Sequence, residues 1–397
     1  MRRLIPCLAI SLVAGAVAQE QDFNSLPKKV VPSPPVVDTD PLSSEDLETS
    51  IRKGVDFLLK IQNKNGSWGG PTDTKGLNIY APLPGAHHAF RMGTSGLALA
   101  GLVMADDPRP EAKAAIDKAE QWLIKELPKL KRPDATTTYN NWGHAYGLRA
   151  INALAQREGI SAEKKAEYAK LAQEQVDALV RYQDIDGGWG YLHFDSVTQR
   201  PSGESTSFLT GTVLLAIHEA KELFGVSFPK DRLMMAMQSI HIQQTPDFSY
   251  VYAMGHRKVP RYDINRPAGS LARTPVCNAA LRVWGDEKIT DEVLTQGLDR
   301  LVKRNGWLDI GRKRPRPHET HFAISGYFYF YGHYYASECI TMLPKEEQAE
   351  WKDKLAKILL DKQESDGSWW DYPLYSYGPP YGTGYTLAAL SRCRKTQ

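Results

Sequence analysis

Residues 183–189 read Gln-Asp-Ile-Asp-Gly-Gly-Trp, and close variants stand at residues 62–68 (Gln-Asn-Lys-Asn-Gly-Ser-Trp) and 363–369 (Gln-Glu-Ser-Asp-Gly-Ser-Trp). Each copy follows an amphipathic run with the period of a helix. One phrase at recurring positions is typical of a repeat architecture, in which every repeat supplies one supersecondary unit. The three copies therefore decide the fold class before any single residue does.

The residue types in each copy indicate a structural role. The glycine permits the left-handed turn that ends a helix. The glutamine amide can hydrogen-bond open backbone groups there, and the tryptophan ring can cover that amide from water. We interpret these side chains as structural clamps and not as catalysts. They are Gln62, Trp68, Gln183, Trp189, Gln363 and Trp369.

Outward from these phrases, the chain reads as six pairs of helices. The first helix of each pair has one charged face, as expected on the outside of a fold. These runs are 45–62, 110–127, 161–182, 230–243, 290–304 and 346–363. The second helix is small and apolar nearly all round, which predicts burial. These runs are 94–105, 144–156, 206–220, 271–284, 321–340 and 384–392. The alternation predicts an all-α fold, an (α/α)6 toroid of six inner and six outer helices.

The first 18 residues have the pattern of a secretory signal peptide. Arg2 and Arg3 precede a short apolar stretch, and Ala16-Val17-Ala18 is a small-residue cleavage site. The apolar stretch is too short to span a bilayer, so we expect no transmembrane segment. We predict an exported protein, periplasmic or secreted, with a signal peptide at 1–18, a Pro-rich disordered leader at 19–44 and a toroid domain at 45–397.

Charge and cysteine content narrow the functional classes. The formal net charge is +3, which gives no global attraction to nucleic acid or anionic membranes. After the signal peptide only Cys277, Cys339 and Cys393 remain. An odd and sparse set is not a disulfide framework. Cys277 and Cys339 lie in apolar helical runs, and we interpret them as small buried hydrophobic residues.

The connections from outer to inner helices are long, and all of them should meet at one rim of the toroid. We call the connections 63–93, 183–205, 244–270, 305–320 and 364–383 the rim loops. Long ordered loops on a rigid scaffold usually carry function, and the inner-helix N-termini add partial positive charge there. Arginines, histidines and tyrosines are concentrated in these loops and in the adjoining helices. An aromatic cavity under a cationic mouth suits a ligand with an apolar body and an anionic head. Alternatively, the tyrosines fill the toroid centre and the arginines are solvated or paired.

The phrase Gln-x-x-x-Gly-Ser/Gly-Trp between outer and inner helices resembles the QW repeats of squalene cyclases and of protein prenyltransferase β subunits. Both belong to the terpenoid cyclase/protein prenyltransferase α/α-toroid superfamily. The resemblance covers about residues 45–393, with degenerate copies at Asn141-Trp-Gly143 and Asn305-Gly-Trp307. It implies the toroid fold and a hydrophobic, isoprenoid-like ligand in the lumen.

The motifs of the two parent activities are absent or incomplete. Triterpene cyclases use an Asp-x-Asp-Asp acid motif and two toroids, and this chain has no such motif. Protein prenyltransferases bind zinc through an Asp-x-Cys pair at inner helix five and a His at inner helix six. Here Glu319-Thr320-His321 falls near the first position, His318 could join it, and Gly382 stands where the second His belongs. We therefore predict no metal ion and identify no particular cofactor.

Whether the protein transforms its ligand stays open at this point. If it does, their placement at the rim favours Glu319 and His321 as acid/base or metal-binding groups. The predicted ligand-binding residues are His88, Arg91, His144, Tyr146, Arg273, Tyr327 and Tyr385. One alternative is a cell-envelope polysaccharide hydrolase or lyase on the same fold. It would need either two opposed carboxylates or a Lys, Arg or Tyr base, and the candidates are the rim acids Glu204, Glu319 and Asp371, with Arg273 and the tyrosines. The other is a non-catalytic interaction scaffold, which predicts a lumen filled by its own side chains.

Overall fold

The computed structural model describes residues 42–72, 84–130, 139–191 and 202–394, and these residues belong to one compact unit, Pro34–Gln397. The predicted signal peptide and the leader up to residue 41 lie outside the described residues. Within the described part of the chain, no helix has the length and apolar character needed to cross a membrane.

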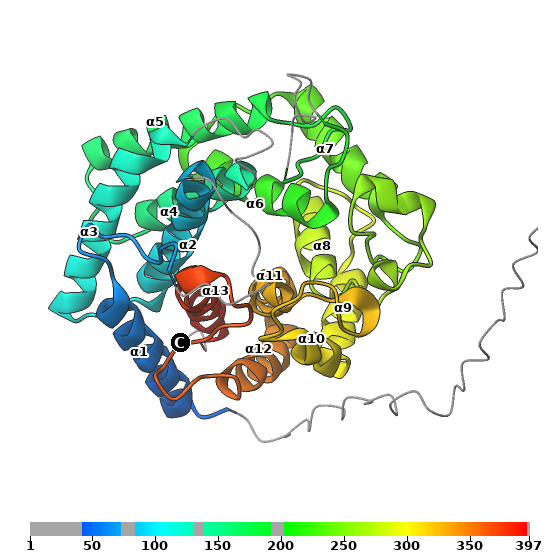
Figure 1. Cartoon of the computed structure of the whole chain (residues 1–397). Helices are drawn as coiled ribbons and strands as arrows, with labels where there is room; N and C mark the ends of the chain where they lie inside the picture. The colour runs from blue at the N-terminus through cyan, green and yellow to red at the C-terminus, as the bar shows by residue number, and fades with distance from the viewer. Residues whose placement is uncertain (1–41, 73–83, 131–138, 192–201, 395–397) are drawn as a thin grey trace, which may run out of the picture. The chain divides into compact units, whose positions relative to one another are not determined.

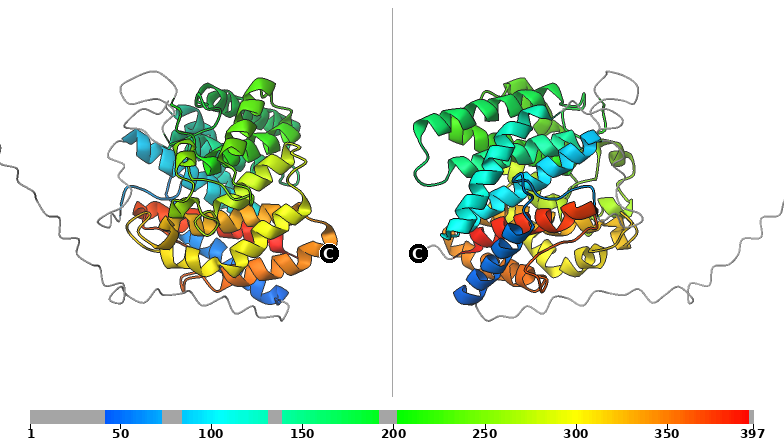
Figure 2. Two further views of the ribbon diagram at one scale, coloured as in Figure 1. Left: turned by 90° about the vertical axis from the view of Figure 1, so that its right-hand side faces the viewer. Right: turned by 60° about the vertical axis from the view of Figure 1, so that its left-hand side comes forward.

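The described residues form two concentric layers of helices (Figure 1). The inner helices are α2 (Pro84–Ala105), α4 (Asn140–Ala155), α6 (Ser207–Phe224), α8 (Arg273–Val283), α11 (Tyr329–Thr341) and α13 (Gly378–Cys393). The outer helices are α1 (Ser44–Ile61), α3 (Pro110–Glu126), α5 (Ala162–Arg181), α7 (Lys230–Gln243), α9 (Asp291–Lys303) and α12 (Lys345–Leu360). The predicted all-α toroid of six inner and six outer helices is confirmed. Side views show the two layers running alongside each other (Figure 2).

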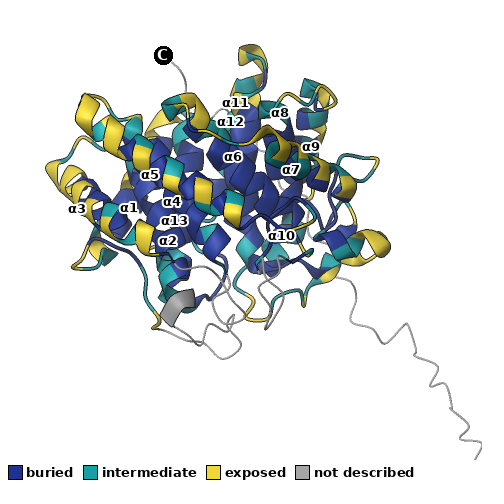
Figure 3. Ribbon diagram, turned by 90° about the horizontal axis from the view of Figure 1, so that it is seen from above, coloured by how far each residue is buried: buried dark blue, intermediate teal, exposed yellow. Residues whose placement is uncertain are grey.

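The hydrophobic pattern explains which helix enters which layer. α1 buries one stripe, which includes Leu47, Ile51, Val55 and Leu58, and exposes the charged residues of its opposite face, as expected for an outer helix. By contrast, α6 is buried on every side along its first eleven residues, 207–217. Seen from above, exposed residues gather on the outer layer and buried residues fill the interior (Figure 3).

The inner ring closes because α13 packs against α2, so the last repeat meets the first. Their backbones approach so closely that a Cβ built on Gly384 would lie 2.5 Å from the carbonyl carbon of Leu97. A Cβ on Gly101 would lie 2.7 Å from the carbonyl oxygen of Gly384. The small residues of the inner helices are therefore required by close helix packing.

The repeat phrases tie neighbouring repeats together. The Gln183 Nε2 donates to the carbonyl oxygens of Gly187 (2.6 Å) and of Arg232 in the next outer helix, α7 (2.9 Å). The buried Trp189 donates from Nε1 to Leu179 O in α5 (2.8 Å), and its backbone N–H donates to Thr210 Oγ1 in α6 (3.0 Å). One phrase thus joins its own outer helix, its own inner helix and the following outer helix.

The other two copies repeat the same bonds. Gln62 donates to Gly66 O and Ala115 O, and Trp68 donates to Leu58 O. Gln363 donates to Gly367 O and Ser50 O, and Trp369 donates to Leu359 O. The third copy bonds α12 to α1, so it closes the outer ring.

Inner helix five differs from the sequence prediction. The predicted helix 321–340 begins only at Tyr329, so its predicted start is wrong. Two separate 3-10 turns, His321–Ala323 and Gly326–Phe328, precede it. Phe322 and Ala323 have φ angles of 59° and 50°, in the left-handed region that interrupts a right-handed helix. A short helix that was not predicted, α10 (Asn305–Gly311), lies in the preceding rim loop.

Candidate functional site

An aromatic cavity of about 250 Å³ lies among the inner helices and the rim loops. Its described lining comes from α2, α4, α6, α11 and α13 together with the rim loops. The lining residues are Phe90, Tyr139, Trp142, Tyr191, Phe208, Leu209, Thr212, Pro317, His318, Tyr327, Phe328, Tyr331, Tyr372, Leu374, Tyr381 and Tyr385. None of these described lining residues is a carboxylate, a lysine or an arginine. We call this site the aromatic cavity.

His318 is the one histidine in the described lining, and it is held neutral. Its Nδ1 lies 2.7 Å from the carbonyl oxygen of Ala323, which can only accept, so Nδ1 carries the proton. The Tyr327 hydroxyl lies 3.2 Å from Nε2. Burial lowers the pKa of His318, and the nearby Arg273 and His256 lower it further. The aromatic cavity therefore presents hydroxyl groups and rings, without a net charge.

A network of phenol hydroxyls fills the lumen next to the aromatic cavity. Tyr385 donates to the Tyr146 hydroxyl, which lies 3.2 Å from that of Tyr335. Tyr335 in turn donates to Thr212 Oγ1 (3.1 Å). Burial raises the pKa values of Tyr146 and Tyr385 well above the ordinary value, so both phenols stay neutral. Of the three predicted ligand-binding tyrosines, Tyr327 and Tyr385 line the cavity, and Tyr146 lies behind the lining.

Ion pairs occupy the region around the C-terminal half of α11. Arg149 of α4 donates to Tyr334 Oη (2.7 Å) and to Glu338. Arg392 of α13 donates to the same Glu338 (3.0 Å), and Glu219 of α6 lies 3.4 Å from Arg149. Two cations and two carboxylates balance here, so this partly buried cluster joins three inner helices to α11 and leaves no excess charge.

The structure places Glu319 and His321, the predicted acid and base, away from the aromatic cavity. Both side chains are exposed, and neither belongs to the described lining. The His321 ring instead packs edge-on against Trp307, with 5.5 Å between ring centroids. The two 3-10 turns before α11 cause this placement, because they replace the helix that would have directed His321 toward the lumen.

Arg273 is fully buried, and its guanidinium is hydrogen-bonded to backbone carbonyl groups. Its guanidinium donates to Gly269 O (3.0 Å), to Tyr250 O (3.1 Å) and to Ile264 O. Burial lowers the pKa of Arg273 to about 10, so the group remains charged at neutral pH. It therefore holds the rim loop 244–270 against the start of α8, and its charge lies 5.9 Å from the Phe328 ring in the cavity wall.

The remaining predicted ligand residues separate into two places. His144 is buried, its Nδ1 lies 2.8 Å from Gln175 Oε1, and burial lowers its pKa to about 4. A neutral histidine bonded to α5 is not available for an anionic head group. His88 and Arg91 do lie together, but in a cleft between α2 and α3 and not in the aromatic cavity.

Asp371 is a buried acid beside the cavity, and the sequence indicated it only as a candidate acid for the polysaccharide alternative. Its Oδ2 accepts from the backbone N–H of Phe330 at the start of α11 (3.0 Å), and its Oδ1 accepts from the hydroxyl of Tyr381. Burial raises the pKa of Asp371 to about 7. The available sequence signal was its position two residues after Trp369, where a repeat phrase turns toward the rim.

The described part of the chain contains no assembled metal site, and the described lining of the aromatic cavity contains no pair of carboxylates. No group of three or more His, Cys, Asp or Glu side chains there is placed to hold a metal ion. Glu204, Glu319 and Asp371 are not among the described lining residues of the aromatic cavity. Cys277, Cys339 and Cys393 are buried free thiols.

Comparison with known proteins agrees with this architecture. The type II terpene cyclase MstE from Scytonema is 16% identical, covers 88% of this chain and 98% of its own, and superimposes with a TM-score of 0.51. An α-1,6-mannanase of Salegentibacter is 9% identical, with coverages of 87% and 98% and a TM-score of 0.53. At these identities the likeness shows the fold alone. No curated protein matches the chain in sequence.

A match to a family profile carries more weight than these distant structures. The profile of the squalene-hopene cyclase C-terminal domain matches residues 36–235, which is half of the chain. That stretch contains two of the three repeat phrases, at 62–68 and 183–189, together with the first three inner helices. The chain belongs to the squalene-hopene cyclase C-terminal domain family.

Proposed function

We propose that the aromatic cavity binds a small apolar, isoprenoid-like ligand. The observation that carries this proposal is a lumen cavity walled by rings from five inner helices, without a charged group among its described lining residues. Such walls bury apolar surface, and their π faces favour unsaturated chains. The terpene cyclase likeness and the family membership agree with this ligand class without establishing it.

The volume of the cavity limits the size of the ligand. A protein cavity of about 150 Å³ holds benzene, and drug-sized ligands occupy roughly 300–1,000 Å³. By proportion, about 250 Å³ accommodates on the order of ten carbon atoms. A ligand of two isoprene units would fill the described cavity, whereas a triterpene would be too large for it.

The two alternatives are less well supported. A polysaccharide hydrolase needs two carboxyl groups on opposite sides of the scissile bond, and the described cavity lining contains none. A scaffold without a ligand predicts a filled lumen, and an open cavity remains beside the tyrosine network. We also propose export through the signal pattern at residues 1–18, which N-terminal sequencing of the secreted or periplasmic protein would test by a start at Gln19.

Calorimetric titration with a ten-carbon isoprenoid alcohol tests the ligand proposal. Leu209 is buried and lines the cavity, so Leu209→Phe should occupy the binding volume and weaken binding at least about tenfold. Leu374→Phe offers a second filler from a rim loop. Met234→Phe on the exposed face of α7 is the matched control and should bind like the wild type.

Two results would count against the proposal. One is an absence of binding by the wild-type protein to any apolar probe of this size. The other is equal affinity in the wild type and in both folded filler variants. Circular dichroism of each variant establishes that it is folded before the titration.

A further inference from the structure

A strongly basic concave surface lies outside the aromatic cavity. A cleft of about 830 Å³ separates the turn after α1, the start of α2 and the face of α3. Its described lining includes the cations Lys64, Arg91, Lys118 and Lys125. We call it the basic cleft.

These four cations are not neutralised by the described residues around them. Glu126 is the one carboxylate in the described lining, and it already pairs with Lys129 at 2.8 Å. No ion pair in the described part of the chain takes up any of the four cations. An uncompensated group of cations in a concave site raises the local concentration of anions.

Two buried nitrogen atoms at the cleft lack hydrogen-bond partners, namely His88 Nε2 and Arg91 Nε. Buried polar atoms without partners are rare in folded proteins, and each requires an explanation. His88 also contacts the backbone of Glu126, and the adjacent Arg91 and Lys129 help to lower its pKa. An anionic ligand would supply acceptors to Arg91 and favour protonation of His88.

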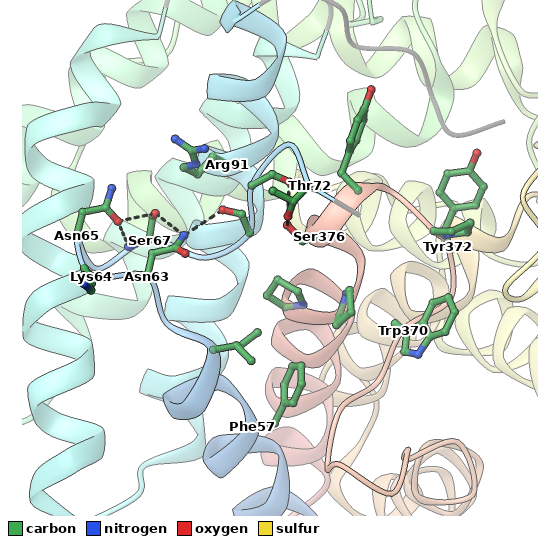
Figure 4. Close-up of a pocket in the computed structure, with 17 residues that line it drawn as sticks. Phe57, Asn63, Lys64, Asn65, Ser67, Thr72, Arg91, Trp370, Tyr372 and Ser376 are labelled. Atoms are coloured by element: carbon green, nitrogen blue, oxygen red, sulfur yellow. Dashed lines mark hydrogen bonds between the residues drawn. The ribbon is translucent and has the colours of Figure 1, made fainter. Parts of the chain in front are cut away.

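The basic cleft continues into a second groove of about 860 Å³, which shares Lys64, Asn65 and Arg91 with it. Figure 4 shows this groove, with Arg91 on one side and Trp370 on the opposite side. Phe57, Trp370 and Tyr375 contribute rings to its wall, and no carboxylate is among its described lining residues. Each of the two volumes is close to the upper limit for small-molecule pockets, so together they suit an extended ligand.

We propose that the basic cleft and this groove form a binding site for an acidic oligosaccharide. Its anionic groups would lie against Arg91 and the lysines of the basic cleft. Its sugar rings would lie against Trp370 and Tyr375. Because no paired carboxylates line the described site, the expected activity is binding and not hydrolysis.

Two other polyanions fit the observations less well. A membrane surface contacts protruding residues, whereas these cations line a concave site. Nucleic-acid binders usually carry a broad basic surface, whereas the formal net charge of this chain is only +3. The site shares only Tyr372 with the described lining of the aromatic cavity, and none of the residues changed in its test lines that cavity, so its failure would leave the isoprenoid proposal unaffected.

Calorimetric titration of the full chain with a short oligogalacturonate tests the proposal. The wild type should bind this probe with an affinity that falls as salt rises, and should bind the fully methyl-esterified, neutral oligomer at least about tenfold more weakly. The triple variant Lys64→Gln, Lys118→Gln, Lys125→Gln removes three exposed cations and should weaken binding about tenfold or more.

A matched triple variant, Lys165→Gln, Lys288→Gln, Lys345→Gln, changes the net charge equally at exposed positions elsewhere and should bind within about twofold of the wild type. Trp370→Leu should weaken binding through the groove. The proposal is overturned if the wild type does not bind oligogalacturonate, if both triple variants lose affinity equally, or if Trp370→Leu has no effect. It is also overturned if the cleft variant selectively loses single-stranded DNA or phosphatidylglycerol vesicles and keeps the oligosaccharide.

Discussion

At the scale of single residues, several polar side chains that are typical of active sites serve the fold. Arg273 donates to three backbone carbonyl groups through its Nη atoms, and His144 Nδ1 is hydrogen-bonded to Gln175. The repeat glutamines likewise donate both amide protons to backbone carbonyl oxygens, as Gln183 does to Gly187 in its own turn and to Arg232 in α7. Buried polar groups need such partners because an unpaired one costs about 1–3 kcal/mol.

Replacing a repeat glutamine tests this role. In Gln183→Ala the carbonyl oxygens of Gly187 and Arg232 each lose a donor, so we expect the free energy of unfolding to fall by about 2–4 kcal/mol. Gln238→Ala on the exposed face of α7 is the control and should change it by less than about 0.5 kcal/mol. Urea unfolding measures both values, and equal effects would refute a clamp at Gln183.

Asp371 predicts a dependence of stability on pH. Its pKa is about 7 in the folded protein and 3.8 in the reference state, so the folded state binds more protons between these values. The contribution of Asp371 to the free energy of unfolding therefore decreases as pH rises from about 4 to about 7, and is constant above that range.

Asp371→Asn should remove this contribution, because its amide can still accept from Phe330 and donate to Tyr381. Relative to the wild type, the variant should gain stability steadily from pH 4 to pH 7. Parallel urea titrations across this range provide the measurement. A difference between the two proteins that is independent of pH would contradict the buried, proton-binding state of Asp371.

At the scale of elements, inner-helix glycines set the spacing of the ring. Gly384 on α13 faces the backbone of Leu97 on α2. Gly297 on the outer helix α9 has more room. A Cβ added there would lie 3.4 Å from its nearest neighbour, Thr274 Cγ2. Close packing therefore excludes a side chain at Gly384, whereas the surroundings of Gly297 leave room for a methyl group.

The same substitution at these positions should have effects of opposite sign. Gly384→Ala should lower the free energy of unfolding by about 2 kcal/mol or more, because the methyl group separates α13 from α2. Gly297→Ala should raise it by about 1 kcal/mol through helix propensity. Thermal and urea unfolding of both variants decide the matter, and destabilisation of similar size at both sites would argue against backbone contact as the cause.

At the scale of the whole toroid, stability depends on closure of the two rings. Gln363 exchanges two hydrogen bonds with Ser50 across the outer seam. Arg394 pairs with Glu48 at 2.8 Å and donates to Ala105 O at 2.8 Å. On the inner seam, α13 packs between α11 and α2. The last helix therefore completes contacts that begin with the first.

A truncation after Tyr377 should abolish cooperative unfolding, because it removes α13 and exposes the facing surfaces of α2 and α11. A truncation after Arg394 keeps every described contact of that helix and should unfold like the full chain. Circular dichroism melting and gel filtration compare the two. A sharp transition in the shorter protein would show that the open ring is stable alone.

The repeat, the helix pairs and the layer of each helix can all be predicted from the sequence. Hydrophobic periodicity and the phrase at 183–189 are local properties, and local patterns predict amphipathic helices well. The bounds of α1 and α7 follow the predicted runs 45–62 and 230–243 within about one residue. The start of inner helix five did not follow, because left-handed turns at Phe322 and Ala323 depend on how the rim loop packs.

The chemistry of each polar residue, by contrast, depends on its surroundings in the folded chain. The sequence placed His88, His144, Arg273, Glu319 and His321 near one rim, but it did not indicate which of them would be buried, paired or exposed. That depends on neighbours far apart in the chain, such as Gln175 for His144 and Tyr250 for Arg273. The order of residues specifies periodicity, whereas the charge, pKa and accessibility of a side chain depend on what surrounds it in space. The aromatic cavity, the buried Asp371 and the basic cleft therefore became recognisable only in the folded chain.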